Sequence, residues 1–306
     1  MEDSMNTVLL RTYVTIVQCG NLSKASELLF TSQSTVSYRL KKLEEEVNGA
    51  LVIREKGTEK IAITPLGDQF YLLAMNYLLL AEEMMHLNHS DGEFYFLIVA
   101  GTQSTINVTL KEFITHLISH NKFRLYLYTD HSYQVVDKVT RFVADTGFIN
   151  YQPRESRLNY RKLFEEELCL LCRQDSPFCD GTNAQALNPR YEIYSLWSAE
   201  YENWHRLTFG ITYNSMLTVR TGGSLLFDSF FHPEMWYICP YSVAQMIMKT
   251  SDRPLVIYSL DEPLPKVPIL QVQNTQYQNR PSAMRLFNEQ LDAYVEELKR
   301  RDPHIS

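Results

Sequence analysis

The sequence predicts a chain of three parts: a mainly α amino-terminal region with a short β-hairpin, a long helix, and a two-lobed α/β region. Within the first 64 residues, apolar residues recur at helical spacing, and only on either side of Gly57 do they alternate with polar residues as in a β-hairpin. From residue 65 they repeat at intervals of four and three, and beyond residue 91 buried strands alternate with amphipathic helices. We therefore expect boundaries at residues 1–64, 65–90 and 91–306. Within the last part we expect lobe I at about 91–167 and 267–306, and lobe II at about 168–266.

The stretch 21–43, NLSKASELLFTSQSTVSYRLKKL, predicts two short helices joined by a polar turn at residues 30–32. We expect Ser23 to cap the first helix, and Thr31 or Ser32 to cap the second. Apolar residues three or four apart face inward on both helices, which leaves hydroxyls, an amide and cations outside. An ordinary helical hairpin with a solvated basic face explains these residue types equally well, so the flanking sequence has to decide.

The flanking sequence favours a DNA-binding module. An upstream apolar stripe ends at Gly20, and downstream the runs LVIRE and KIAIT flank Gly57 as a β-hairpin. A helix, a helix pair and a basic hairpin together make a winged helix-turn-helix. From about Leu9 to Gly67 the sequence resembles the amino-terminal domain of LysR-type transcriptional regulators, through NLSKASELLFTSQSTVS, then LKKLEEE, then TPLG.

Three positions depart from the family pattern. Tyr38-Arg39 stands where Arg-Gln is frequent, Asn48 where the helix usually ends in Gly, and Val52 where Phe is usual. Asn tolerates the left-handed conformation, so the helix end is preserved. The change at Tyr38-Arg39 affects the bases recognised and leaves the fold intact.

Exposed hydroxyls, amides and cations on such a module read base edges and hold phosphates of double-stranded DNA. We expect Gln33 and Arg39 to read bases, and the wing residues Arg54 and Lys56 to contact the backbone or the minor groove. The full expected DNA-binding set, on a roughly palindromic operator, is Ser23, Lys24, Ser32, Gln33, Ser34, Ser37, Tyr38, Arg39, Lys42, Arg54, Lys56 and Lys60.

The net charge of −7 lies entirely beyond residue 66, because residues 1–66 hold eight Lys or Arg and eight Asp or Glu. DNA binding therefore has to depend on the local placement of cations. The first residues are polar and acidic, and the longest apolar run without a charge, 69–81, is too short to span a bilayer. With an odd number of cysteines, five, we expect a cytoplasmic protein with no membrane partner.

The long helix starts at Thr64-Pro65 and carries a strict seam of the kind that pairs two helices. A helix that packs on its own domain remains an alternative, because Leu72, Leu78 and Leu79 widen the stripe. In the LysR family this helix links the domains and dimerises, which implies a homodimer or a dimer of dimers. The expected dimerisation residues are Leu66, Phe70, Leu73, Tyr77, Leu80, Met84 and Leu87.

The third part resembles the effector domain of the same family, which is similar to a periplasmic binding protein. The resemblance implies a small molecule in the cleft between the lobes, which alters the DNA bend and the contact with RNA polymerase. The stretch GTQST at 101–105 opens a helix and suits an anion, although a routine cap explains it too. The stretch YSLWSAEYENWH suggests a wall for an aromatic ligand, although aromatics at this spacing also build cores. The expected effector contacts are Thr102, Gln103, Ser104, Thr105, Thr129, Phe148, Ser195, Trp197, Ser198 and Trp204.

Cys169, Cys172 and Cys179 offer an alternative, a regulator that senses redox state or a metal ion. Residues three apart on a strand point to opposite faces, which is a poor arrangement for one metal ion. The sequence contains no Gly-rich phosphate loop, metal-binding His pair or nucleophile elbow, so we expect no catalytic residue, metal or cofactor. A ligand-binding protein or an enzyme with an incidental helix-turn-helix is the remaining alternative.

Overall fold

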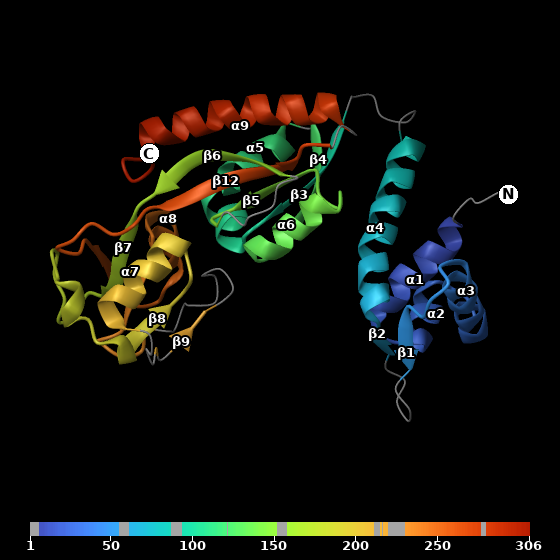
Figure 1. Ribbon diagram of the computed structural model, residues 1–306, viewed down its shortest axis with the longest axis horizontal. Coiled ribbons are helices and arrows are strands. Elements are labelled where there is room, and N and C mark those ends of the chain that lie inside the picture. Colours follow the sequence, from blue (N-terminus) through green and yellow to red (C-terminus); the bar gives the residue numbers. More distant parts are fainter. Residues whose placement is uncertain are drawn as a thin grey trace. The chain divides into compact units, whose positions relative to one another are not determined.

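The computed structural model divides into two compact units, Met1–Gly92 and Glu93–Ser306 (Figure 1). It describes residues 6–54, 61–86, 94–120, 122–151, 158–210, 215, 217–219, 230–276 and 280–306.

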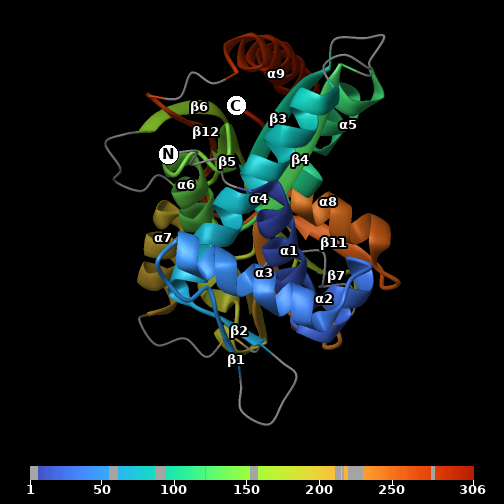
Figure 2. The same ribbon diagram turned by 90° about the vertical axis from the view of Figure 1, so that its right-hand side faces the viewer.

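The first unit contains the predicted winged helix-turn-helix followed by the long helix. Its elements are α1 (Thr7–Cys19), α2 (Leu22–Leu28), α3 (Gln33–Glu46), β1 (Val52–Arg54), β2 (Ile61–Ile63) and α4 (Pro65–His86). The strands β1 and β2 pair antiparallel, and Figures 1 and 2 show them extending from one end of the helical cluster. The core joins the inner faces of α1, α2 and α3 to one face of α4.

The helix ends follow local chemistry, with one correction to the predicted caps. Gly20 ends α1 with φ 63°, and Asn48 takes φ 51° after α3, as its tolerance of the left-handed conformation predicts. Ser32 caps α3 as expected, because its hydroxyl accepts a hydrogen bond from the Thr35 N–H at 3.1 Å. The prediction that Ser23 caps α2 is wrong, since the side chain of Asn21 accepts from the N–H groups of Ser23 and Lys24. Asn21, two residues before Ser23, holds the N-cap position, and its extended backbone makes its side chain the better acceptor.

The second unit contains two five-stranded sheets, as the two-lobed α/β prediction requires. Sheet I has the order β4-β3-β5-β12-β6 and sheet II the order β11-β7-β10-β8-β9. Sheet I and its helices comprise β3 (Tyr95–Gly101), η1 (Thr105–Thr109), α5 (Lys111–Ser119), β4 (Phe123–Thr129), α6 (Ser132–Thr140), β5 (Thr146–Ile149), β6 (Leu158–Glu166), β12 (Val267–Asn274) and α9 (Pro281–Arg301). Sheet II and its helices comprise β7 (Leu168–Arg173), η2 (Ala184–Ala186), η3 (Pro189–Tyr191), β8 (Glu192–Tyr194), α7 (Ala199–Phe209), β9 (Leu217–Thr218), β10 (Trp236–Pro240), α8 (Tyr241–Thr250) and β11 (Leu255–Tyr258).

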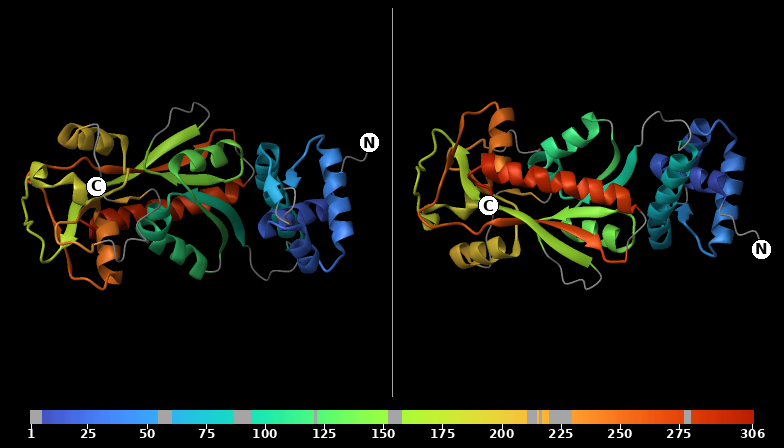
Figure 3. Two further views of the ribbon diagram at one scale, coloured as in Figure 1. Left: turned by 90° about the horizontal axis from the view of Figure 1, so that it is seen from below. Right: turned by 90° about the horizontal axis from the view of Figure 1, so that it is seen from above.

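Sheet I is covered on both faces. Phe148 points into the core that α5 and α9 close, whereas the neighbouring Gly147 faces α6. A Cβ atom at Gly147 would lie 2.5 Å from Val135 of α6 and 2.8 Å from Val272, so only glycine permits this close packing. Figure 3 shows α9 running along this sheet. The parallel pairing of β3 with β4 and β5 sends the carboxyl ends of all three strands to one edge.

Two crossings of the chain connect the sheets. The strand β6 ends sheet I at Glu166, and β7 begins sheet II two residues later. The chain returns through β12, which pairs antiparallel with both β5 and β6. The strand β9 covers Leu217–Thr218, while residues 216, 220 and 221 lie outside the described residues. No described helix has the length and apolar character needed to cross a membrane.

Candidate functional site

The helix α3 presents a polar face beside the wing. It buries Val36, Leu40 and Leu43, while Gln33 and Ser34 are exposed and Tyr38 is 67% exposed. Ser37 is half-buried on the same side. At the amino end of the helix the Ser32 hydroxyl lies 2.8 Å from the hydroxyls of both Ser34 and Thr35. The outer face thus offers hydroxyl and amide groups that can exchange hydrogen bonds with base edges.

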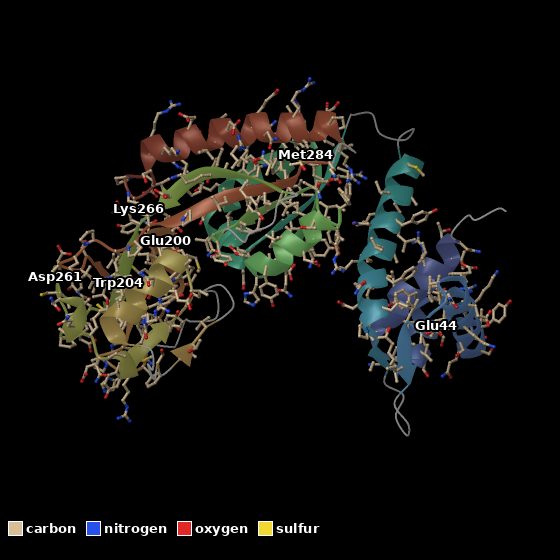
Figure 4. The ribbon with its side chains drawn as sticks, viewed as in Figure 1. Glu44, Glu200, Trp204, Asp261, Lys266 and Met284 are labelled. Carbon is tan, nitrogen blue, oxygen red and sulfur yellow. The ribbon has the colours of Figure 1, made fainter. Side chains whose placement is uncertain are left out.

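A groove of about 480 Å³ lies between α3 and β1. Its residues are Ser34, Ser37, Tyr38, Leu40, Lys41, Glu44 and Val52. Glu44, labelled in Figure 4, accepts hydrogen bonds from the backbone N–H groups of Leu51 (2.8 Å) and Val52 (3.2 Å). This carboxylate therefore attaches the base of the wing to α3, a role that the sequence did not indicate.

The predicted cations are distributed unevenly. Lys24 and Lys42 are exposed, whereas Arg39 is half-buried, with Nη1 3.5 Å from the Thr12 hydroxyl of α1. In this conformation Arg39 lies against α1, and its expected role as a base reader stays a prediction. Arg54 ends β1, and Lys56 and Lys60 lie outside the described residues.

The long helix α4 has two apolar faces. Ala74 and Leu78 are buried against the core of the first unit, and the Phe70 ring meets the Tyr13 ring edge-on at 5.6 Å. Phe70 therefore packs within its own unit instead of in the predicted seam. Leu87 lies outside the described residues. The other predicted seam residues are exposed by 42–67% and form the exposed α4 stripe: Leu66, Leu73, Tyr77, Leu80 and Met84.

In the second unit, the predicted hydroxyl loop lies at the carboxyl edge of the parallel strands, where ligands bind in open α/β sheets. The hydroxyls of Thr102 and Thr105 are 2.7 Å apart, and Thr105 is 1% exposed. Gln103 and Ser104 are half-buried, and Thr129 is exposed at the end of β4. The Ser132 hydroxyl donates a hydrogen bond of 2.8 Å to the Asn150 side-chain oxygen, and this bond connects the segments that follow β4 and β5. The edge is polar, but its most buried hydroxyls pair with each other.

A pocket of about 260 Å³ extends from this edge to the first turn of α7 in the other lobe. It is lined by Asn150, Tyr151, Tyr160, Lys162, Ala199, Glu200, Pro268 and Leu270. Figure 4 labels Glu200 at the end of α7 nearest to β6 and β12. The ammonium group of Lys162, which pairs with the Glu165 carboxylate at 3.2 Å, and the amino end of α7 favour an anionic group, whereas the Glu200 carboxylate opposes one. Two tyrosine rings offer apolar faces. The expected set contained none of these residues.

The expected aromatic wall is the core of lobe II. Trp197 is 4% exposed and donates its indole N–H to the Ile238 carbonyl at 2.8 Å, and Phe148 is fully buried in lobe I. A ligand in the cleft cannot touch side chains that are covered in this way, so both expectations are corrected. Ser195 bonds to the Val219 carbonyl and the Tyr237 hydroxyl, Ser198 caps α7, and Trp204 packs on Tyr201. Apolar packing, the alternative interpretation, explains this stretch.

The two cysteines of β7 give no support to thiol chemistry, whereas Cys179, the third residue of that alternative, is exposed. Cys169 and Cys172 are buried on β7, and the Cys169 thiol donates to the Cys239 carbonyl at 3.4 Å. Burial raises the pKa of the Cys172 thiol, which keeps it in its unreactive protonated form. Over the described ranges, no three His, Cys, Asp or Glu side chains come together as a metal site.

Both parts of the chain match models of one protein family. Residues 8–68 match the model described as "Bacterial regulatory helix-turn-helix protein, lysR family", and residues 110–190 match "LysR substrate binding domain". The chain belongs to the LysR family.

This LysR-family chain is 27% identical to the HTH-type transcriptional regulator CysL of Bacillus subtilis (strain 168) over 175 residues, which are 55% of this chain and 57% of CysL. It is 24% identical to the Hca operon transcriptional activator HcaR of Escherichia coli (strain K12) over 233 residues, 70% of this chain and 77% of HcaR. These relatives are regulators of transcription and not enzymes.

Solved structures share the fold of the LysR-family chain. The crystal structure of CbnR, a LysR family transcriptional regulator, gives a TM-score of 0.72 at 18% identity and covers 95% of this chain and 99% of CbnR. Full-length CbnR complexed with its target DNA gives 0.71 at 19% identity, covering 94% and 99%. A Corynebacterium glutamicum OxyR C206 mutant gives 0.55 at 18% identity, covering 97% and 93%. The winged helix-turn-helix and the two-lobed α/β fold are therefore those of LysR-family structures.

Proposed function

We propose that this LysR-family protein regulates transcription by binding double-stranded DNA and by responding to a small molecule in its second unit. The observation that carries the proposal is the polar outer face of α3, which stands beside a hairpin wing on a helix buried on its other side. In this proposal residues 1–64 bind DNA, residues 65–90 link and dimerise, and residues 91–306 bind the effector.

The exposed α4 stripe supports dimerisation. Its residues follow spacings of seven, four, three and four, and they leave an apolar face uncovered after Ala74 and Leu78 have packed on the first unit. A second copy of α4 buries such a face by helix pairing. In the resulting dimer, or in a dimer of dimers, two copies of α3 bind the two half-sites of a roughly palindromic operator.

The pocket between the lobes supports an effector that carries an anionic group, with or without an aromatic ring. Lys162 and the first turn of α7 would hold the anion, while Tyr151 and Tyr160 would flank the rest of the molecule. Occupancy would shift the arrangement of the lobes or of the subunits, and through it the DNA bend and the contact with RNA polymerase. We assign these events to the cytoplasm.

In vitro selection tests the proposed function. The purified full-length chain is mixed with random double-stranded DNA, and the retained fragments are amplified and sequenced over several rounds. We expect enrichment of one pair of inverted half-sites spaced by about one or two helical turns. The same protein with Gln33, Ser34 and Ser37 replaced by Ala should enrich no sequence. Absence of any enriched sequence with the unchanged chain would refute the proposal.

A further inference from the structure

Three described residues other than glycine have a positive φ: Phe30 (49°), Asn48 (51°) and Phe142 (60°). Asn tolerates this left-handed region because its short polar side chain bonds locally, whereas a bulky side chain is a steric outlier there. Phe30 and Phe142 both follow a helix, and each donates its N–H to a carbonyl three residues back, that of Glu27 at 3.1 Å and that of Val139 at 3.2 Å. Glycine closes such helix ends without strain.

The exposed ring of Phe30 adds no packing energy to offset its unfavourable backbone conformation. Its side chain is 96% exposed, more than any other large apolar side chain described, and Leu28 beside it is 64% exposed. The ring therefore contributes almost nothing to the core of the first unit, while its backbone conformation disfavours it. Strained, exposed residues of this kind occur at functional sites, where a partner supplies the missing contacts.

The position of Phe30 identifies that partner. Phe30 lies in the turn between α2 and α3, two residues before the cap Ser32 and three before Gln33. It thus directly precedes the first turn of α3, which carries the exposed Gln33 and Ser34. We propose that the Phe30 ring makes an apolar contact with the operator, against the C5-methyl group of a thymine or a deoxyribose at the edge of each half-site. This inference rests on the proposed function and adds a specificity-determining residue to it.

The chemistry of the surface explains why an apolar contact matters here. Among the bases, only thymine displays a methyl group in the major groove, and phenylalanine is one of the side chains that read it. The first 66 residues carry equal numbers of cations and anions, so nonspecific attraction to phosphates is weak. An apolar contact adds affinity that does not depend on counterion release.

Phe30→Gly in the full-length chain tests the proposal, with Phe142→Gly as the matched control. Both changes remove a phenylalanine from a left-handed turn, but Phe142 belongs to the second unit. We expect neither variant to lower Tm, because relief of strain offsets the freedom that glycine adds to the unfolded chain. Phe30→Gly should weaken binding to the selected operator about fourfold per half-site, the value of roughly one buried methyl group. The salt dependence of binding should stay unchanged, and Phe142→Gly should bind as the unchanged chain does.

Replacing thymines by uracil, one position at a time, separates the two apolar sources. If the methyl group is the contact, one substitution in each half-site weakens the unchanged chain and has no effect on Phe30→Gly. If Phe30→Gly binds more weakly but no uracil substitution matters, the contact is with deoxyribose. Equal affinity of Phe30→Gly and the unchanged chain for the operator would overturn the inference. The proposed function would be unaffected, because it is tested separately by the enrichment of an operator sequence. A loss of binding accompanied by a smaller mass in sedimentation would also overturn it, because the ring would then join two copies of the chain.

Discussion

A carboxylate oxygen of Glu166, at the end of β6, accepts a hydrogen bond of 2.8 Å from the backbone N–H of Ser242, in the first turn of α8. The other oxygen lies 3.5 Å from the Thr109 hydroxyl of η1. Glu166 is 1% exposed, and its backbone forms an isolated bridge with Ile305. This single buried side chain joins the first turn of a lobe II helix to lobe I where the chain crosses between the sheets.

Replacing Glu166 by Gln should make the stability of the second unit less dependent on pH. Burial raises the pKa of the Glu166 carboxyl above its ordinary value. The folded state therefore favours the protonated form, and this contribution is present at low pH and lost as the pH rises through the folded pKa. Gln still accepts from Ser242 but stays neutral. Above the folded pKa the variant should be more stable by about 1.4 kcal/mol for each unit by which the pKa is raised.

Urea unfolding from about pH 4.5 to pH 8 measures this difference. Glu165→Gln is the control, because it changes a neighbouring carboxyl that is only half-buried. Identical pH dependence in Glu166→Gln and the unchanged chain would show that Glu166 does not titrate in this range.

Charges in the exposed α4 stripe should dissociate the oligomer without unfolding the chain. Leu73 and Leu80 are 55% and 42% exposed, so Lys at both positions costs the single chain little. In a paired seam each Lys should cost several kcal/mol through desolvation and repulsion. We expect a smaller sedimenting species, an unchanged Tm of the first unit and no specific DNA binding.

Glu82→Lys is the control for the seam. Residue 82 follows Leu73 by nine positions, two and a half turns around α4, and so lies on the opposite side of the helix. The change replaces an exposed ion pair with Arg11 at 3.3 Å by an exposed pair of like charges, which costs little in solvent. Its mass should equal that of the unchanged chain. A Leu73→Lys, Leu80→Lys variant that also keeps its mass would place the dimer contact elsewhere.

Two exposed residues of α3 should have different roles in DNA binding, one in base recognition and the other in phosphate binding. Gln33 is exposed in the first turn of α3, and a good bidentate contact with adenine contributes about 1–3 kcal/mol of discrimination. Gln33→Ala should therefore relax the choice of base at one position of each half-site. Lys42→Ala, at an exposed cation on the same helix, should weaken all sequences alike and reduce the salt slope by about one. The affinities of both variants for operator and scrambled DNA are measured across a salt series. If Gln33→Ala weakened both DNAs equally and Lys42→Ala changed the preferred base, the two assigned roles would be exchanged.

Lys162 should govern the affinity for anionic effectors. In a panel of aromatic and aliphatic carboxylates, a ligand of the pocket should raise Tm by mass action. Lys162→Gln should reduce that rise by about the effect of a tenfold weaker Kd, since a hydrogen bond to a charged group contributes roughly 1.5–3 kcal/mol. Lys122→Gln serves as the control, because Lys122 lies at the opposite, amino-terminal edge of β3 and β4. A ligand whose effect survives Lys162→Gln binds outside this pocket.

Local patterns were enough to predict the first unit. The helix pair, the turn at residues 30–32 and the end of α3 at Asn48 depend on contacts within a few residues, which the spacing of apolar and capping residues encodes. The same patterns predicted the alternating elements of the second unit. They did not reveal that Asn21 takes the capping role assigned to Ser23, because two polar residues, separated only by Leu22, compete for one cap.

By itself, then, the sequence determined which face of each element is apolar, and through it the winged helix-turn-helix, the apolar periodicity of α4 and the α/β order. Only the tertiary structure decided what covers each face. It turned Phe70 toward Tyr13, buried Trp197 under Ile238, and brought Tyr160 and Lys162 of β6 to the first turn of α7, some forty residues away. The physical reason is that periodicity records the side of its own helix or strand on which a residue lies, whereas a cleft is made by loops and strand ends that meet only when distant segments pack.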